Sequence, residues 1–475
     1  MNTAIRKTSP GSVPPQIYRL TNTVQHYDWG SHTDIRELLN TPESGKPEAE
    51  LWLGAHPSAP SLAAPWSDSI LPNSDSELHD GSHVILREVA ESRANVGPIA
   101  LDRLIQQMPV EMLGNRVLDK FGPKLPYLLK VLAADRALSL QVHPASHLAR
   151  AGFNRENREK VPITAPHRNF KDGNHKPEMI IAVTEFHALA GLRPPRVVLR
   201  MIEGLSGQLF DLIRDAIAHN PNHDGIKSAL TNLLAQRNSE LLHPHLAEAI
   251  NSIKSRVMAG SQYQVADQTA LDLAAEYPGD VGALSSYLLN RVTLLPGEAL
   301  FMGDGEVHAY LKGLGIEIMA NSDNVLRAGL TSKHVDVNAL IECMSFHPKM
   351  PHRPDQYEIG EISRSYSYRP PVEEFALTMF DLHDGEPLPI QAGGPRIVLV
   401  LEGEVFFSYG GAAGIVTDAP VNTSTGRVMT RPTSVISGLP PTTVALTRGV
   451  SVFVPDVIGP AELSGSGQVV CAWVP

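Results

Sequence analysis

The fold is decided by the stretch Leu138-Ser139-Leu140-Gln141-Val142-His143-Pro144, which ends a long apolar run starting at Leu129. Such a run is typical of a buried strand. Gln141 and His143 are two positions apart, so on an extended segment they point to the same face, and Ser139 points there too. An amide oxygen beside an imidazole nitrogen suits a divalent metal ion. The stretch therefore predicts half of a metal site inside a β-barrel.

Two residues elsewhere in the chain have the chemistry to complete this site. Glu178 follows Lys176-Pro177, and the proline fixes how the chain enters the next apolar strand. His308 ends the stretch Gly305-Glu306-Val307-His308 between two apolar runs. Each also has a plainer interpretation, Glu178 as an edge carboxylate paired with Lys176 and His308 as a loop histidine.

A set made of Gln141, His143, Glu178 and His308 would form a mononuclear centre without cysteine. Nitrogen and oxygen ligands of this kind allow Zn²⁺, with Fe²⁺, Mn²⁺, Co²⁺ and Ni²⁺ as alternatives. Open coordination positions would hold water or a substrate oxygen. The chain is therefore predicted to be a metalloenzyme.

Composition restricts the classes of function. A chain of 475 residues predicts two or three domains, and a net charge of −11 argues against a nucleic-acid binder without excluding an anionic substrate. The two cysteines, Cys343 and Cys471, are too few for a disulfide framework, so we expect a reduced, cytoplasmic setting. Residues 1–15 lack the apolar core of a signal peptide, and no apolar run approaches the ~20 residues of a membrane span.

The spacing of apolar and turn-forming residues changes three times along the chain, and this pattern predicts a mainly β protein with a helical insert. We expect four segments: 1–194, rich in β-strands; 195–289, an α-helical insert of about four or five helices; 290–375, β-rich again; and 376–475, a C-terminal β region. The repeat and the resemblance described below imply that 1–194 and 290–375 form a catalytic cupin-type jelly roll and that 376–475 forms a degenerate cupin-like barrel. Within the four segments we expect helices at 33–39, 102–113 and 337–343, a strand at 84–86 and a surface loop at 67–82.

A weak internal repeat supports two related barrels. Gly297 is followed by Gly303 and, eleven positions on, by His308, which fits the second half of a cupin-type motif apart from the proline expected at Gly303. A second copy starts at Gly449 and has that proline, but the position that would hold the histidine is Pro460. We therefore expect no metal ligand at this position of the second barrel.

The segment Asn321–Lys333 concentrates polar groups, and its plain interpretation is a long turn. Against that, Arg327 stands between Leu326 and Ala328. An arginine in apolar surroundings near a cavity often holds an anion or stabilises developing negative charge.

Five stretches together resemble type I mannose-6-phosphate isomerases, and they occur in that family's order. They are Tyr27-Asp28-Trp29-Gly30-Ser31, Ala49-Glu50-Leu51-Trp52-Leu53-Gly54-Ala55-His56-Pro57, Leu138–Pro144, Asn174-His175-Lys176-Pro177-Glu178 and Asn321–Lys333. The similarity spans nearly the whole chain. It implies a zinc-dependent cupin enzyme that interconverts mannose 6-phosphate and fructose 6-phosphate.

The resemblance also implies roles for single residues. Gln141, His143, Glu178 and His308 match the family's metal ligands, and Arg327 matches its active-site arginine. Residues matching substrate-binding positions are Ser139 and Lys176, at the phosphate, and Trp29, Tyr310, Glu317, Asp323 and Lys333, lining the pocket. Ser332 replaces the family's usual proline, which makes the assignment of Lys333 less secure, and the loop 67–82 looks like an insertion.

The implied reaction removes a proton next to a carbonyl and passes through a cis-enediol. Arg327 is always protonated and suits the stabilisation of its negative charge. The base stays open among Glu317, Asp323, Lys333 and a metal-bound water. Rival hypotheses are a non-catalytic cupin that binds sugars and an Fe²⁺ cupin dioxygenase. The partner expected is a small sugar phosphate, with no nucleic acid and no membrane, and the assembly a monomer with a homodimer left open.

Overall fold

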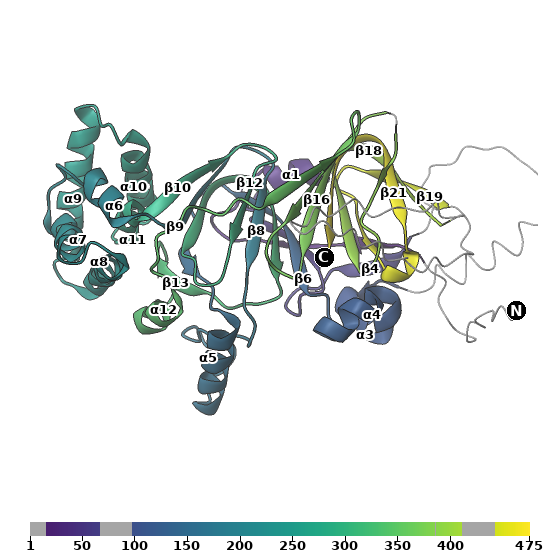
Figure 1. Ribbon diagram of the computed structural model, residues 1–475, viewed down its shortest axis with the longest axis horizontal. Helices are drawn as coiled ribbons and strands as arrows, with labels where there is room; N and C mark the ends of the chain where they lie inside the picture. The colour runs from purple at the N-terminus through teal and green to yellow at the C-terminus, as the bar shows by residue number, and fades with distance from the viewer. Residues whose placement is uncertain (1–15, 67–96, 385, 411–441) are drawn as a thin grey trace, which may run out of the picture.

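The computed structural model describes residues 16–66, 97–384, 386–410 and 442–475. The strand expected at 84–86 and the loop expected at 67–82 lie outside the described residues, as do residues 1–15. Two large β-sheets form the body of the described chain, with helices at one end and along one side (Figure 1). A mainly β protein with helices is therefore confirmed.

A ten-stranded antiparallel sheet forms the middle of the molecule, and its central path runs β10-β9-β12-β6-β3-β2. Its strands are β2 (Thr23–Gln25), β3 (Glu50–Gly54), β6 (Tyr127–Ala134), β7 (Leu140–Val142), β8 (Glu178–Ala182), β9 (Phe186–Leu192), β10 (Leu289–Leu294), β11 (Ala299–Met302), β12 (His308–Ala320) and β13 (Leu326–Gly329).

An eleven-stranded antiparallel sheet packs beside it, with a path of β14-β15-β16-β21-β18-β20-β1-β4-β5. Its strands are β1 (Tyr18–Thr21), β4 (Leu62–Pro65), β5 (Ile99–Ala100), β14 (Asp355–Ile359), β15 (Arg364–Arg369), β16 (Ala376–Leu382), β17 (Leu388–Pro389), β18 (Arg396–Tyr409), β19 (Thr442–Thr447), β20 (Ser451–Val454) and β21 (Ala461–Trp473). Strands from both ends of the described chain thus share one sheet, since β1 pairs with β20.

The helices form three groups. Those at the end of the molecule are α6 (Pro195–Met201), α7 (Gln208–His219), α8 (His223–Ala235), α9 (Leu242–Met258), α10 (Gln264–Glu276) and α11 (Gly282–Ser285), with the 3₁₀ turns η1 (Gln236–Asn238) and η2 (Ser286–Leu288). Beside the sheets lie α1 (Asp34–Leu39), α3 (Leu101–Gln107), α4 (Pro109–Phe121) and η3 (Asp456–Ile458). Near the middle sheet are α5 (Ser146–Arg158) and α12 (Val337–Cys343).

Side chains along the strands of the middle sheet point alternately to its two faces, and the two faces have different surroundings. Leu51, Leu129 and Ile316 face a core that they share with residues of the eleven-stranded sheet, such as Leu399. The opposite face encloses smaller apolar clusters, whose members include Leu132, Ile180, Trp52 and Met319. Because neighbouring side chains on a strand point to opposite faces, polar residues in register with the second set are directed inward. This interior holds the candidate site.

Strand β12 carries one irregularity. Tyr310 pairs with Ala188 and Lys312 with His187, so Leu311 has no partner on β9 and forms a bulge. Gly313 follows with φ of 124°, where a Cβ atom would lie 2.6 Å from the Glu185 carbonyl oxygen. The bulge lies between the end of β12 that begins at His308 and the part that pairs with β6.

Three expectations about local structure are corrected or confirmed. The run 129–140 is not one strand, because β6 ends at Ala134 and β7 begins only at Leu140, so Ser139 and His143 both lie just outside a strand. The helix expected at 102–113 is two helices, α3 and α4, since Pro109 starts a new one. The helix at 337–343 is confirmed as α12.

The repeat seen in the sequence has a structural counterpart. Gly297 and Gly449 have φ of 83° and 80°, the region that favours glycine, and each is followed two residues later by a four-residue strand, β11 or β20. A long strand then begins at His308 in the first copy and at Ala461 in the second.

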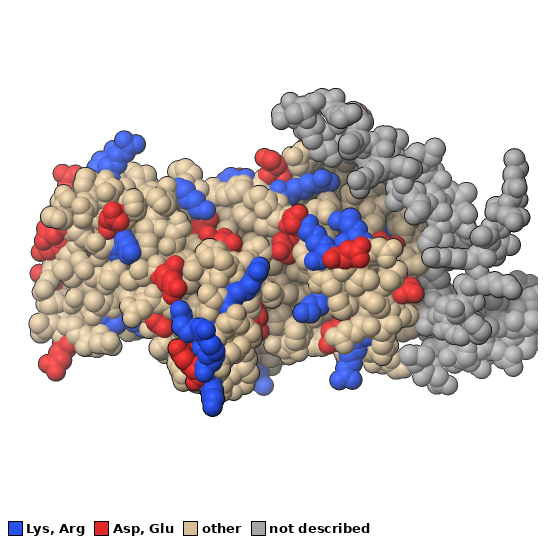
Figure 2. Space-filling view, turned by 60° about the horizontal axis from the view of Figure 1, so that its bottom comes forward, with Lys and Arg blue, Asp and Glu red and all other residues tan. Residues whose placement is uncertain are grey.

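The surface bears mixed charge on the face drawn in Figure 2. The helix α5 carries three arginines, Arg150, Arg155 and Arg158, and its one acidic residue, Glu156, is buried. Among the described residues, no helix is both long enough and apolar enough to cross a membrane.

Candidate metal centre

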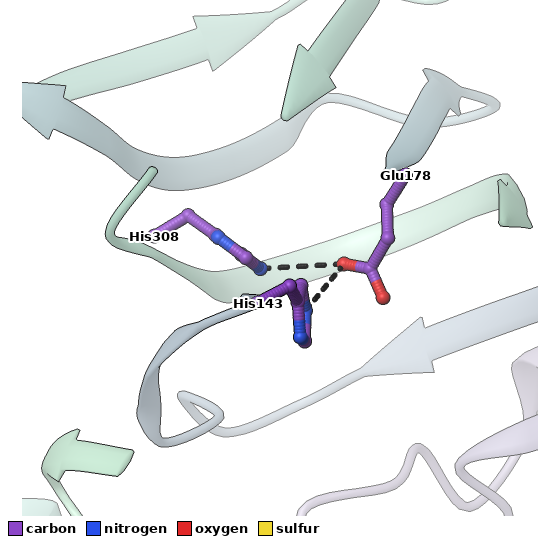
Figure 3. Close-up of side chains that lie close together, drawn as sticks. All are labelled: His143, Glu178 and His308. Atoms are coloured by element: carbon purple, nitrogen blue, oxygen red, sulfur yellow. Dashed lines mark ion pairs between the residues drawn. The ribbon is translucent and has the colours of Figure 1, made fainter. Parts of the chain in front are cut away.

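Three buried side chains from distant parts of the chain converge in the interior of the middle sheet. His143 follows β7, Glu178 begins β8 and His308 begins β12. Both imidazole Nε2 atoms lie 3.3 Å from Glu178 Oε2, as the dashed lines in Figure 3 show. Each of these side chains is 3% exposed or less. The convergence that the sequence could only suggest is therefore present for three of the four expected ligands.

A bound metal ion explains the positions of the donor atoms better than hydrogen bonds between the three side chains do. Neither Nε2 atom has a well-formed hydrogen bond, although both are buried, and buried polar atoms are seldom left unpaired. Two ligands of one tetrahedral zinc ion, bound at 2.0–2.2 Å, lie roughly 3.3–3.5 Å apart. The measured 3.3 Å separations match that spacing. A divalent ion between the three side chains would satisfy both nitrogens.

Backbone carbonyls fix the tautomers of the two histidines. His143 Nδ1 donates to Asn324 O at 2.7 Å, and His308 Nδ1 donates to Glu306 O at 2.9 Å. A carbonyl oxygen only accepts, so each Nδ1 carries the proton and each neutral ring presents the Nε2 lone pair to the centre. Such outer partners commonly orient metal-binding histidines.

The turn before His308 also holds His143. Gly305 N donates to His143 O at 2.8 Å. Gly305 has φ of 73°, and a Cβ atom there would lie 3.0 Å from Cys343 O, so both the conformation and the space favour glycine.

Electrostatics keep two of these ligands, His143 and Glu178, in the forms that bind a cation. Burial lowers the pKa of His143 to about 4, so its ring is neutral at physiological pH. Burial alone would raise the pKa of Glu178, but Lys176 and His143 outweigh burial and hold that pKa well below its usual value. Burial would likewise lower the pKa of His308, but the neighbouring Glu178 carboxylate raises it.

Gln141 and Arg327 join the group through strand register. Gln141 pairs with His308 on β12 and with Arg327 on β13. Residues directly opposite each other in antiparallel strands place their side chains on the same face, so Gln141 stands between the histidine and the arginine. The Arg327 guanidinium forms no hydrogen bond or ion pair with any described residue, and burial lowers its pKa.

A buried charge network lies deeper in the same interior. Lys130 Nζ is 3.0 Å from Glu317 Oε2 and 3.3 Å from Glu50 Oε1, and Trp52 Nε1 donates to Glu50 Oε2 at 2.7 Å. Burial would lower the pKa of Lys130, but the two carboxylates raise it, whereas burial raises the pKa of Glu317. Burial also raises the pKa of Tyr310, which faces the same interior.

The sequence analysis missed Lys130 and Glu50 as candidates. A signal was present, because Lys130 is the single charged residue in an eight-residue strand that is buried throughout. His56 was missed as well. Its Nε2 lies 3.4 Å from Asp323 Oδ1, and this interaction lowers the pKa of Asp323.

The remaining predicted residues lie around this group. Lys176 Nζ forms an ion pair with Glu178 Oε1 at 2.7 Å. Lys333 Nζ lies 6.0 Å from the ring centre of Tyr27, which stacks on Trp29 at 5.6 Å. The Ser139 hydroxyl forms no hydrogen bond with any of these residues.

Two hollows on the surface are separate from this group. One of about 530 Å³ is lined by residues such as His32, Asp135 and Lys312, and another of about 360 Å³ lies between the two sheets. Neither is lined by His143, Glu178 or His308, so the donor chemistry rather than the size of a hollow identifies the centre.

Comparison with known proteins agrees with this geometry. Residues 17–80 and 74–195 match the family model described as phosphomannose isomerase type I, catalytic domain. The chain is 35% identical over 392 residues to mannose-6-phosphate isomerase of Shigella flexneri, covering 82% of this chain and 89% of that one. It is 31% identical to the Bos taurus enzyme of that name, covering 82% and 88%.

Solved structures match over almost the whole length. A zinc-bound mannose 6-phosphate isomerase superposes with a TM-score of 0.74 at 30% identity, covering 97% of this chain and 99% of that one. A point mutant of phosphomannose isomerase from Salmonella typhimurium gives 0.75 at 29% identity, with the same coverage.

Proposed function

Since the chain belongs to the type I phosphomannose isomerase family, we propose that it is a zinc-dependent isomerase that interconverts mannose 6-phosphate and fructose 6-phosphate. The observation that carries the proposal is the pair of unbonded Nε2 atoms, on His143 and His308, directed at one carboxylate oxygen. The ion would be held by these residues together with Gln141. The reaction would connect mannose and GDP-mannose metabolism to fructose 6-phosphate.

We also infer that both β regions are cupin-type jelly rolls. Support comes from the matching turn and strand after Gly297 and Gly449, and from the single histidine that distinguishes the two copies. The first barrel would be catalytic. The second, with Pro460 where His308 stands in the first, would have a supporting role.

Bound zinc would act as a Lewis acid toward the oxygens on the two reacting carbons. Arg327 adds a permanent positive charge without a competing carboxylate among the described residues, so it can stabilise the cis-enediol as negative charge develops. Partial burial strengthens that interaction, because fewer water molecules screen it.

Glu317 is the best base among the candidates left open by the sequence. Its pKa is raised by burial, which suits a group that must accept and return a proton near neutral pH. Asp323 has a lowered pKa and is 47% exposed, and Lys333 sits beside Arg327 near the surface. Glu317 would carry the proton between the two adjacent carbons while Lys130 holds its carboxylate in place.

The phosphate would bind away from the reacting carbons. Lys333 is the better candidate for this role, because it has no ion pair to any described residue, whereas Lys176 is engaged with Glu178. Ser139 remains a second candidate from the resemblance. Binding energy from the phosphate would align the sugar for proton transfer.

A coupled assay tests the proposal. Purified protein should convert mannose 6-phosphate to fructose 6-phosphate and contain about one zinc ion per chain. Chelation should abolish the conversion, and added Zn²⁺ should restore it. Full activity in metal-free protein would reject the metal's role, and absence of activity in zinc-loaded protein would favour a sugar-binding cupin.

A further inference from the structure

Asn324 links the metal centre to a second loop through its main chain and its side chain at once. Its carbonyl oxygen is the acceptor for His143 Nδ1, at 2.7 Å. The residue is 0% exposed and lies between β12 and β13, on the segment that leads to Arg327. Any shift of Asn324 therefore moves the acceptor that orients His143.

The amide side chain of Asn324 is fully used in holding the loop 171–174. Its Oδ1 accepts from Lys171 N at 2.7 Å and from Asp172 N at 3.2 Å. Its Nδ2 donates to Asp172 O and to Asn174 O, each at 2.9 Å, and to Asp172 Oδ1 at 3.2 Å. Both the donor and the acceptor of the amide are needed, which only asparagine supplies at this size.

Asp172 completes the connection from the other side. Its carboxylate accepts from Ser322 Oγ at 2.9 Å and from Asp323 N at 2.9 Å. Together, Asn324 and Asp172 hold the loops 171–174 and 321–324 against each other. We call this set of contacts the Asn324 clamp.

The clamp joins the parts of the chain that carry different metal ligands. The loop 171–174 runs directly into Lys176 and Glu178, while the carbonyl of Asn324 orients His143. One residue therefore connects the loops that support two ligands far apart in sequence. A metal site gains affinity when its ligands are held in place before the ion arrives.

We propose that Asn324 is a positioning residue that sets the affinity for the metal ion by fixing His143 relative to Glu178. This rests on the metal role proposed for His143, Glu178 and His308. Asn324 touches neither the expected ion nor the substrate, so it acts through the ligands and not as a ligand itself.

The test measures Zn²⁺ affinity directly, by competition with a chromophoric chelator, in the full-length protein. Asn324→Ala removes every side-chain contact of the clamp. Asn324→Asp keeps the shape and the acceptor but loses the donor and places a carboxylate against Asp172. We expect the dissociation constant for Zn²⁺ to rise by about 10- to 100-fold in both variants. The rise in Tm produced by Zn²⁺ should shrink accordingly.

Asn222→Ala is the matched control. Asn222 also accepts two backbone N–H groups, those of Asp224 and Gly225, but it does so at the start of α8, in the helical region. Its loss should lower Tm in metal-free and zinc-loaded protein alike and leave Zn²⁺ affinity unchanged.

The outcomes separate the possible failures. Wild-type affinity in folded Asn324→Ala or Asn324→Asp protein would overturn the proposal, and so would an equal loss of affinity in Asn222→Ala. If Asn324→Ala does not fold, Asn324→Asp decides alone. Failure of the wild-type protein to bind Zn²⁺ would instead reject the proposed function.

Discussion

Lys176 Nζ lies 2.7 Å from Glu178 Oε1, so the lysine that the family resemblance assigns to the substrate phosphate is also the ion-pair partner of a metal ligand. The pair is almost completely buried, with the two side chains 10% and 3% exposed. Removing one partner of a buried pair leaves the other charge uncompensated, which is costly. The two expected phosphate-binding lysines, Lys176 and Lys333, should therefore behave differently when mutated.

Lys176→Ala should weaken zinc retention as well as activity, since Glu178 loses the cation that holds it in place. Lys333→Ala should raise KM for mannose 6-phosphate about 10-fold or more and leave zinc content unchanged, because the Lys333 ammonium lies over the ring of Tyr27 and forms no ion pair with a described residue. Metal analysis and steady-state kinetics on both variants check this. A full zinc content in Lys176→Ala would show that its ion pair does not support the centre.

Arg327→Ala should lower kcat by about 10²- to 10³-fold while zinc content stays near one per chain. The reason is that the guanidinium faces Gln141 in the strand register but forms no ion pair with a described ligand. Arg327→Lys is the control, since it keeps the charge and loses the planar fork, and it should recover part of the rate. A near-normal kcat in Arg327→Ala would remove this residue from the mechanism.

Glu317→Gln should lower kcat by about 10²- to 10⁴-fold, as expected for loss of a general base. In the wild-type protein, the acid limb of kcat against pH should lie above the ordinary glutamate pKa of 4.5, because burial raises the pKa of Glu317. Glu50→Gln is a matched control, since both carboxylates contact Lys130. Equal losses in the two variants would mean that Glu317 only holds the lysine.

His175→Gln should destabilise the protein most near pH 6 and progressively less toward pH 10. Hydrogen bonds to Asp304 and Glu374 raise the pKa of His175 from 6.5 to about 10 in the folded protein. A raised folded pKa contributes stability that is complete below 6.5 and lost as the pH rises through 10. Melting temperatures of the wild-type protein and of His175→Gln across this pH range check the prediction. A difference in Tm that does not change with pH would contradict it.

The sequence was sufficient to predict the donor residues of the centre but not the surroundings that tune them. Glu178 and His308 could be selected because they sit beside glycine and proline at the edges of apolar runs. The lone lysine in an apolar strand, Lys130, could have been selected as a buried charge, but its partners could not be predicted from the sequence. Its role depends on register, which places it opposite both Trp52 and Glu317.

Ser139 illustrates the opposite error. Strict alternation along one long strand predicts that Ser139, Gln141 and His143 share a face, but the strand is interrupted between Ala134 and Leu140. Gln141 and His143 still reach the same region, because the turn at Gly305 and the carbonyl of Asn324 hold His143 from two sides. Such long-range contacts cannot be read from periodicity.

The bulge at Leu311 in β12 changes which side chains of this strand face the interior that holds the candidate site. His308 and Glu317 are an odd number of positions apart, so on a regular strand they would face opposite sides of the sheet. The extra residue lets both face the interior, one beside Glu178 and the other beside Lys130. Deleting one residue at this point would invert the strand beyond it, sending Glu317 toward the neighbouring sheet. The length of one short stretch of backbone thus decides whether the proposed metal site and the proposed base share a single cavity.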